Sequence, residues 1–181
     1  MVYLFSVQPE GFKELILHPG ETYAEHNCLQ WNSESKLGTW RSPKLVWLQD
    51  EFTEKSDADG DFLKFQGGTP VLSSRAYATL EPLLKDSVEF LPVWVDGEKR
   101  YLLNVLHVLD LMEKSRSTFK IYGDGQIGAC EHAYINEPNS GEYIFKVNGY
   151  LPRVFINETI KNEIESAGLT GTLIREYKNP Q

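Results

Sequence analysis

The spacing of apolar and polar positions in the middle of the chain predicts an amphipathic helix. Apolar residues recur at helical spacing at Ala76, Tyr77, Leu80, Leu83 and Leu84. Ser73 or Ser74 can cap the start of this helix, because a serine hydroxyl accepts a hydrogen bond from a free backbone N–H. Pro82 should kink or restart the helix, since proline removes a backbone donor.

Two further helices are predicted. Asn157 can cap the first of them and Gly168 can end it. Its apolar face carries Ile160, Ile164 and Ala167. The second is a short helix around residues 22–31, in a stretch that mixes aromatic residues with proline and glycine and has no clear period.

Apolar runs separated by turn signals predict β-strands. Residues 88–95 and 101–106 flank the polar turn Asp96-Gly97-Glu98-Lys99, and two such runs around a short turn pair as a β-hairpin. Further strands are predicted for residues 2–7, 44–49, 119–122, 143–147, 153–156 and 169–177. Because strands and helices do not alternate regularly, the predicted class is α+β, with a mainly antiparallel sheet and a few short helices.

The length of the chain bounds the number of domains. With 181 residues, of which 41% are hydrophobic and 12% aromatic, it can bury a substantial core but is short for two full-sized domains. An acidic loop with glycine, within residues 50–60, is the clearest internal boundary. We therefore expect a single globular domain in which residues 1–68 form a less regular N-terminal part and residues 69–181 form the α+β core.

The acidic balance limits the class of partner. Eighteen basic residues against 26 acidic ones give a formal net charge of -8, which argues against nucleic-acid binding because phosphates are repelled. The charge favours either a basic partner or solubility alone. Residues 1–12 lack a secretion signal, no apolar stretch is long enough for a bilayer, and two cysteines are too few for a disulfide scaffold. We therefore expect a cytoplasmic protein without a membrane partner.

The densest acidic segment is the candidate contact surface for a basic partner. Its carboxylates are Asp50, Glu51, Glu54, Asp57, Asp59 and Asp61. Asp57, Asp59 and Asp61 alternate as in a calcium-binding loop, but Phe62 stands where that loop needs glycine and Gly68 where it needs the closing glutamate. The segment is therefore interpreted as a solvated loop that binds no metal.

Two pairs of histidine and cysteine are the other candidate metal ligands. His26 and Cys28 form the first pair, and Cys130 and His132 form the second. Together they offer the thiolates and imidazoles that zinc prefers, but a single residue between the members of each pair is tighter than the usual two to four. We expect ordinary buried or surface residues and no zinc.

A glycine motif is the candidate cofactor site. Residues 123–128 read Gly-Asp-Gly-Gln-Ile-Gly, which matches the dinucleotide fingerprint that opens a helix in a strand–helix–strand unit. Pro138, Asn139 and Gly141 leave little room for that helix, so a hairpin turn is favoured. The chain also lacks a Gly-x-Ser-x-Gly elbow, so we expect no catalytic residues, no enzyme and no cofactor. The alternatives are a small cofactor-dependent enzyme that uses this motif and a general adaptor or ligand-binding module.

An ordered series of short segments resembles a known family. The segments are residues 69–76 (TPVLSSRA), 80–84 (LEPLL), 89–93 (EFLPV), 101–106 (YLLNVL) with Asp110 after it, 143–146 (YIFK) and 169–171 (LTG). In this order they resemble the eleventh immunity protein family of bacterial polymorphic-toxin systems, formerly a domain of unknown function. The resemblance covers about residues 69–175, while residues 1–68 match only loosely.

The resemblance implies a function in binding. It implies an antidote encoded beside a toxin and kept in the cytoplasm, and the family has no known catalytic residues to carry over. Its recurring positions look structural here, at Ser73, Pro92, Asn104, Asp110, Phe145 and Gly171. The chain is thus expected to bind and neutralise a cognate toxin domain without catalysis. A basic toxin such as a nuclease would fit the acidic segment, which is then the expected toxin-binding surface.

Overall fold

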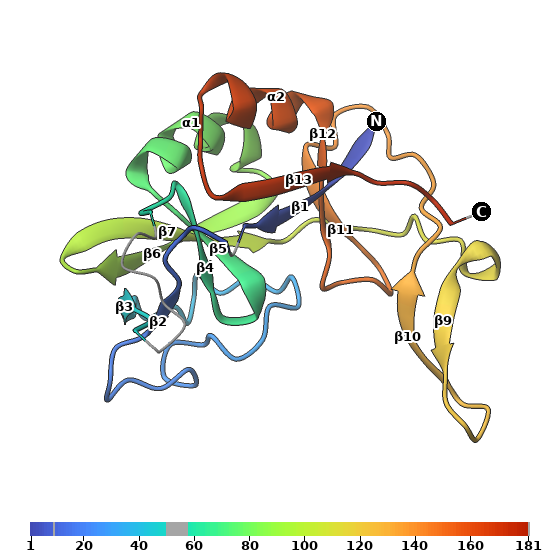
Figure 1. The fold of residues 1–181 in the computed structure, drawn as a ribbon, viewed down its shortest axis with the longest axis horizontal. Coiled ribbons are helices and arrows are strands. Elements are labelled where there is room, and N and C mark those ends of the chain that lie inside the picture. Colours follow the sequence, from blue (N-terminus) through green and yellow to red (C-terminus); the bar gives the residue numbers. More distant parts are fainter. Residues whose placement is uncertain (9, 50–57, 181) are drawn as a thin grey trace.

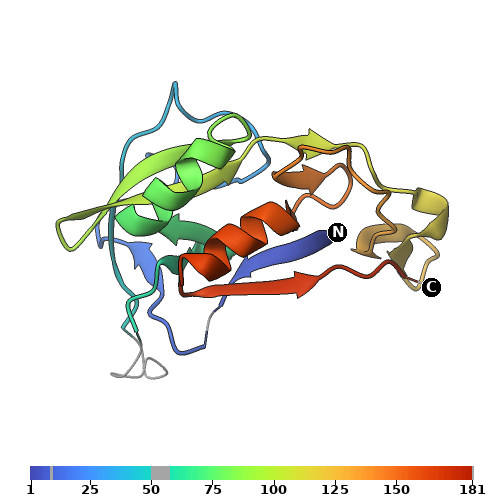
Figure 2. The same cartoon turned by 90° about the horizontal axis from the view of Figure 1, so that it is seen from above.

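The computed structural model describes residues 1–8, 10–49 and 58–180. These residues form two larger β-sheets, a two-stranded ribbon and two α-helices (Figure 1). The two α-helices lie side by side on one side of the molecule (Figure 2). Most strand pairs are antiparallel, which confirms the predicted α+β class with a mainly antiparallel sheet.

The first sheet has six strands in the order β2-β3-β6-β7-β5-β4. Their bounds are Leu15–Leu17 for β2, Lys44–Trp47 for β3, Val88–Val95 for β6, Glu98–Val105 for β7, Thr69–Leu72 for β5 and Phe62–Phe65 for β4. Only the contact of β3 with β6 is parallel within this described sheet. A 3₁₀ turn, Gln66–Gly68, connects β4 to β5.

The second sheet has five strands in the order β13-β1-β12-β11-β8. Their bounds are Thr172–Glu176 for β13, Val2–Val7 for β1, Val154–Asn157 for β12, Ile144–Val147 for β11 and Val108–Leu109 for β8. Strand β1 pairs antiparallel with both β12 and β13. Segments on both sides of residue 68 therefore share a sheet, and the boundary at that residue stays a prediction.

The hairpin of β6 and β7 follows from the turn chemistry of Asp96 and Gly97. Both residues have positive φ, 48° and 85°, as a two-residue turn that matches the strand twist requires. Val95 pairs with Glu98 directly across this turn. The predicted hairpin is confirmed, and β7 begins at Glu98 instead of residue 101 because the turn uses only two residues.

Helix α1, Ser74–Leu84, is capped as its sequence predicts. The Ser73 hydroxyl accepts a hydrogen bond from the backbone N–H of Ala76 at 3.1 Å. Ala76, Leu80 and Leu84 are buried, so the apolar spacing does face the core. The helix continues through Pro82, which lies in its last turn.

Helix α2, Glu158–Ser166, is also capped as predicted. The Asn157 side chain accepts from the backbone N–H of Ile160 at 3.1 Å. Ile160 and Ile164 are buried, and Gly168 follows the helix with a φ of 60°, a left-handed conformation that ends helices.

The helix predicted around residues 22–31 is wrong. Thr22 and Glu25 do exchange the hydrogen bonds of a capping box, but the chain then forms only turns. Asn27 takes a φ of 54°, and the N–H of Cys28 bonds to the carbonyl of Tyr23 at 2.8 Å. A left-handed residue this early stops a helix after one turn.

Five strands have no counterpart among the predicted ones: β2, β4, β5, β8 and β10. Strand β5 illustrates one reason, because all four of its residues are buried, whereas β2 and β8 are only three and two residues long. A strand covered on both faces lacks the alternation of apolar and polar residues that identifies a half-buried strand.

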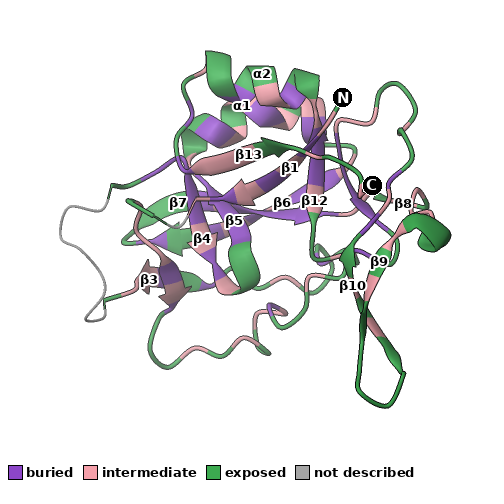
Figure 3. Ribbon diagram, turned by 45° about the vertical axis from the view of Figure 1, so that its right-hand side comes forward, coloured by how far each residue is buried: buried purple, intermediate pink, exposed green. Residues whose placement is uncertain are grey.

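The core is divided between the faces of the two sheets (Figure 3). One apolar cluster joins both sheets to both helices and includes Phe62, Leu103 and Ile164. Alternate residues of the six-stranded sheet, such as Leu102, point to a second cluster with the chain that precedes β4. A third cluster around Phe155 covers the other face of the five-stranded sheet. Both sheets are thus buried on both sides.

Candidate functional site

The acidic segment predicted to contact a partner is only partly within the described residues. Asp50, Glu51, Glu54 and Asp57 lie outside them. Asp59 and Asp61 are described and lie just before or at the start of β4. The structure therefore shows the surroundings of these two carboxylates, and the role of the whole segment stays a prediction.

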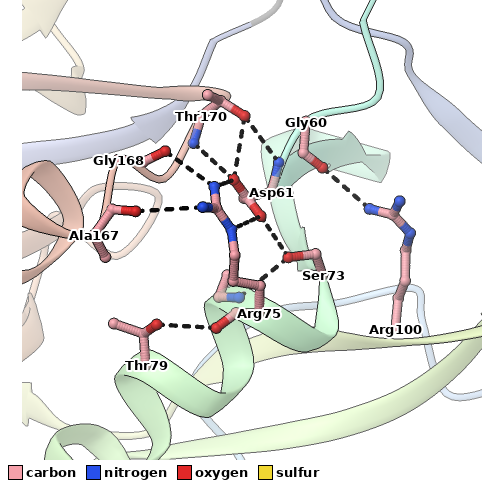
Figure 4. Close-up of polar contacts among 10 residues, drawn as sticks. Gly60, Asp61, Ser73, Arg75, Thr79, Arg100, Ala167, Gly168 and Thr170 are labelled. Carbon is pink, nitrogen blue, oxygen red and sulfur yellow. Dashed lines mark hydrogen bonds and ion pairs between the residues drawn. The ribbon is translucent and has the colours of Figure 1, made fainter.

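Asp61 is the centre of a polar network that joins three parts of the fold (Figure 4). Its carboxylate, in a residue only 9% exposed, accepts hydrogen bonds from Ser73 Oγ at 2.7 Å and from Arg75 Nε at 3.2 Å. It also accepts from the backbone N–H of Thr170 at 3.0 Å, while Arg75 donates to the carbonyl of Gly168. The carboxylate thus links β4, the start of α1 and the loop after α2.

The protonation of Asp61 follows from these contacts. Burial raises the pKa of the carboxyl group, but the hydrogen bonds from Arg75, Ser73 and Thr170 outweigh burial and lower the pKa to about 2. Hydrogen bonds and a neighbouring cation both favour the ionised form. Asp61 is therefore a charged residue that holds the fold together.

Asp59 neutralises a buried arginine. Arg100 is 5% exposed, and its guanidinium donates to Asp59 Oδ1 at 2.6 Å and to the carbonyl of Gly60 at 3.1 Å. The Arg100 side chain also lies over the ring of Trp47. The Asp59 carboxylate keeps 43% of its side-chain surface exposed, so it still reaches solvent while it pairs with Arg100.

The glycine motif at residues 123–128 forms the turn of a hairpin. It connects β9, Thr118–Ile121, to β10, Ile127–His132, and the N–H of Tyr122 bonds to the carbonyl of Gln126 at 2.9 Å. A strand follows the motif where a dinucleotide site needs the N-terminus of a helix. The predicted hairpin turn is confirmed, and the hairpin projects from the rest of the molecule (Figure 1).

The two pairs of histidine and cysteine lie in different parts of the fold. Cys28 is buried against the six-stranded sheet, and burial raises the pKa of its thiol to about 12. His26 contacts Glu21 at 3.4 Å. Cys130 and His132 belong to β10, where His132 contacts the carbonyl of Lys178. Within residues 1–8, 10–49 and 58–180, no three histidine, cysteine or acidic side chains gather as a metal site would need.

A pocket of about 400 Å³ lies where the two sheets meet. Its walls come from β5 and β7 on one sheet and from β11 and β12 on the other. The lining residues are Gln30, Trp31, Asn32, Gly67, Gly68, Thr69, Pro70, Leu103, Asn104, Val105, Lys146, Leu151, Pro152 and Val154. Asn104 and Lys146 are buried, while Asn32 and Gly68 are exposed, so the pocket has a polar floor and an open rim.

Lys146 is a buried cation in this pocket. Its Nζ donates a hydrogen bond to the carbonyl of Trp31 at 2.8 Å, and no ion pair involves it among the described residues. Burial lowers the pKa of the Lys146 amine to about 8. The buried surroundings therefore disfavour the charged form of the Lys146 amine.

Asn104 is the second polar group of the floor. Its Nδ2 donates to the carbonyl of Glu34 and to Glu89 Oε2, both at 3.0 Å. Glu89 also accepts from the backbone N–H of Lys36 at 2.9 Å, and its pKa is lowered, because hydrogen bonds from Ser35, Lys36 and Asn104 outweigh the opposing effect of burial. Two acceptors on Nδ2 fix the orientation of the amide, and the buried Asn104 Oδ1 has no hydrogen-bond partner among the described residues.

Sequence reasoning missed this pocket. Asn104 was expected to be structural, and Lys146 was only part of a strand. One signal was present, because each is a polar residue between apolar neighbours: Leu103 and Val105, or Phe145 and Val147. A polar side chain in a buried strand points to a specific partner or to function.

Comparison with known proteins identifies one family. The model of the immunity protein family Imm11 matches residues 7–179. The match begins well before residue 69, where the recognisable series of segments starts. No curated protein matches the chain. Among the described residues, no helix is long and apolar enough to cross a bilayer.

Proposed function

The chain belongs to the immunity protein family Imm11, and from this premise we propose that it binds a cognate bacterial toxin domain and neutralises it by direct contact. The observation that carries the proposal is the length of the family match, residues 7–179 of the 181. This length supports an immunity function that involves the whole fold. In this proposal the protein has no catalytic role, acts in the cytoplasm and belongs to a polymorphic-toxin system.

The charge of the chain supports a basic toxin as the partner. A formal net charge of -8 attracts a cationic surface from a distance, and such attraction acts mainly on the rate of association. Nuclease domains that bind phosphates need basic surfaces. A basic nuclease is therefore the toxin class that the charge favours.

The acidic segment, defined as Asp50, Glu51, Glu54, Asp57, Asp59 and Asp61, is the proposed toxin-facing region. Asp59 supports this role because 43% of its side-chain surface is exposed even though it pairs with Arg100 of β7. Asp61 would contribute by fixing the end of the segment to α1 through Arg75. The other four carboxylates would then supply the charge that meets the toxin.

The test is protection and binding with the toxin domain encoded beside this protein. Co-expression should restore growth of cells that produce the toxin, and a mutationally inactivated toxin domain should form a stable complex of the two proteins in size-exclusion chromatography. An unrelated immunity protein is the control. Protection without a complex, together with a change in the mass of the toxin, would instead indicate an enzyme that modifies the toxin.

A ligand-binding module is the one alternative that a specific observation favours. The observation is the pocket between the sheets, with its buried Lys146 and with Asn104 Oδ1, which no described residue pairs. The cofactor-dependent enzyme has no such support, because residues 123–128 form a hairpin turn. The pocket is compatible with an immunity function, since one protein can carry both surfaces.

A further inference from the structure

The pocket between the two sheets has the features of a built binding site. We propose that it binds a carboxylate group, which Lys146 Nζ holds, and that Asn104 Oδ1 accepts a hydrogen bond from an N–H or O–H next to that carboxylate. The carboxylate can belong to a small molecule or to an acidic residue of a partner protein. This assignment goes beyond the immunity function: its small-molecule form is independent of that function, and only its protein form rests on toxin binding.

The first argument is the unbalanced charge of Lys146. The residue is 5% exposed and lies on β11 between apolar residues. Its ammonium group has three protons, and the carbonyl of Trp31 accepts one of them. A buried charge is expensive unless it is paired, and no carboxylate of the described residues pairs with Lys146. An anion in the pocket would supply the missing partner.

The second argument is the unpaired oxygen of Asn104. This residue is 1% exposed, and its amide cannot turn round without losing the bonds from Nδ2 to Glu34 and Glu89. Its Oδ1 therefore stays an acceptor to which no described residue donates. Trp31, which also lines the pocket, has a buried Nε1–H that likewise finds no acceptor in the part of the chain that the structure describes. Buried polar groups of native proteins are nearly always paired, so these atoms point to a ligand.

The third argument is the size and shape of the space. About 400 Å³ falls within the range of roughly 300–1,000 Å³ that small-molecule sites occupy. Leu103, Val105 and Val154 offer an apolar wall to a short alkyl group. Asn32, Gly67 and Gly68 on the rim are exposed, so the pocket is reached from solvent.

These features specify the chemistry of the ligand. A carboxylate matches Lys146, a neighbouring donor matches Asn104 and an alkyl group matches the wall. Small α-hydroxy and α-amino carboxylates carry all three, and so does an acidic residue at the end of a peptide chain.

The experiment titrates the full chain with lactate, glycolate and acetate while the Lys146 side-chain resonance is followed by NMR. Lactate and glycolate should bind saturably, and more tightly than acetate, which has no donor for Asn104. The pKa of Lys146 should rise from about 8 toward its ordinary value of 10.5 on binding, because an anion favours the ammonium form. Chloride at equal ionic strength and neutral lactamide should have no saturable effect.

Two variants locate the binding site. Backbone amide resonances of the pocket residues report binding in both proteins, and Lys146→Met should weaken lactate binding by at least about tenfold, since a charge-assisted hydrogen bond is lost. Lys161→Met is the matched control, because Lys161 pairs with Glu165 on the surface of α2 and should leave the affinity unchanged. Should Lys146→Met not fold, the pKa of Lys146 in the wild type decides the question.

A second arm distinguishes the sources of the carboxylate. The inactivated toxin domain should displace lactate if an acidic toxin residue occupies the pocket, and should leave lactate bound if the ligand is a small molecule. Either result supports the site. The proposal is overturned if no carboxylate changes Lys146 saturably and Lys146→Met keeps full toxin affinity, or if the variant responds to lactate as the wild type does. Intact protection from the toxin alongside that failure would leave the proposed immunity function standing.

Discussion

Asp61 and Lys146 are two buried charges of the same fold with opposite surroundings. Asp61 accepts hydrogen bonds from Ser73, Arg75 and Thr170, so its charge is compensated within the chain. Lys146 gives one hydrogen bond to the carbonyl of Trp31 and has no described acidic partner. The first charge therefore stabilises the fold, while the second lowers stability. A charge of the second kind is the one we expect at a binding site.

The largest expected effect is the loss of the Asp61 network. Asp61→Ala leaves Arg75 without its carboxylate and the N–H of Thr170 without its acceptor. We expect the free energy of unfolding to fall by about 2 kcal/mol, because one buried carboxylate loses its hydrogen bonds, while the Arg75 side chain is 57% exposed and regains water. Urea denaturation measures it, with exposed Asp86→Ala as the control. Equal losses in the two variants would contradict the role of the network.

The next largest effect is the loss of the Asp61 contribution to stability at low pH. Asp61 has a folded-state pKa of about 2, lowered from the ordinary value of 3.8. Its contribution is therefore present above pH 3.8 and is lost as the pH falls through about 2. The gap in unfolding free energy between wild type and Asp61→Ala should narrow over this interval. A gap that stays constant during acid titration would show that the Asp61 charge does not contribute.

A substitution at Lys146 is expected to change the free energy of unfolding in the opposite direction. Lys146→Met should raise the free energy of unfolding at neutral pH by about 1 kcal/mol, because a buried charge is replaced by an apolar group of similar size. The folded-state pKa of about 8 is below the ordinary 10.5, so the lysine is unfavourable below pH 8 and becomes less so up to pH 10.5. The advantage of methionine should shrink over that range in chemical denaturation. A destabilised variant would show that Lys146 supports the fold as Asp61 does.

The smallest effect on stability is expected for four carboxylates of the acidic segment. Changing Asp50, Glu51, Glu54 and Asp57 to their amides should leave the free energy of unfolding within about 0.5 kcal/mol of wild type. Association with the toxin should become slower and less dependent on salt, because steering acts on the on-rate. Stopped-flow kinetics at low and high salt measures both quantities.

The control for that experiment changes four exposed carboxylates elsewhere: Asp86, Glu158, Glu163 and Glu176. It removes the same total charge, so a similar slowing in both variants would assign the effect to net charge. No slowing in either would remove the acidic segment from the toxin interface.

Local signals in the sequence were enough to predict much of the fold. The turn at Asp96 and Gly97 and the caps Ser73 and Asn157 depend on contacts within a few residues. The helix predicted around residues 22–31 does not form. Thr22 makes the hydrogen bond of a helix start, but the left-handed Asn27 ends the turn. Buried strands such as β5 carry no alternation, so their pairing follows only from the assembled sheet.

The candidate pocket could not be predicted in the same way. Lys146 and its acceptor Trp31 are 115 residues apart, and Asn104 lies 70 residues from Glu34. These residues come together only where the two sheets meet, so no local sequence pattern predicts the contacts. The Asp61 network also spans the chain, since Thr170 is 109 residues away. The sequence predicted Asp61 as a solvated acid because its neighbours are acidic, whereas its partners come from elsewhere.

The position of β1 between β12 and β13 has a consequence for folding during synthesis on the ribosome. Tyr3 and Phe5 pair only with residues beyond position 153 in the described sheet. At typical synthesis rates, roughly 7–30 seconds pass before those partners are made. During that interval the apolar side of β1 has no sheet to join, and a long-range pairing of this kind slows folding. Nascent chains should therefore bind chaperones through residues 2–7 until β13 completes the sheet.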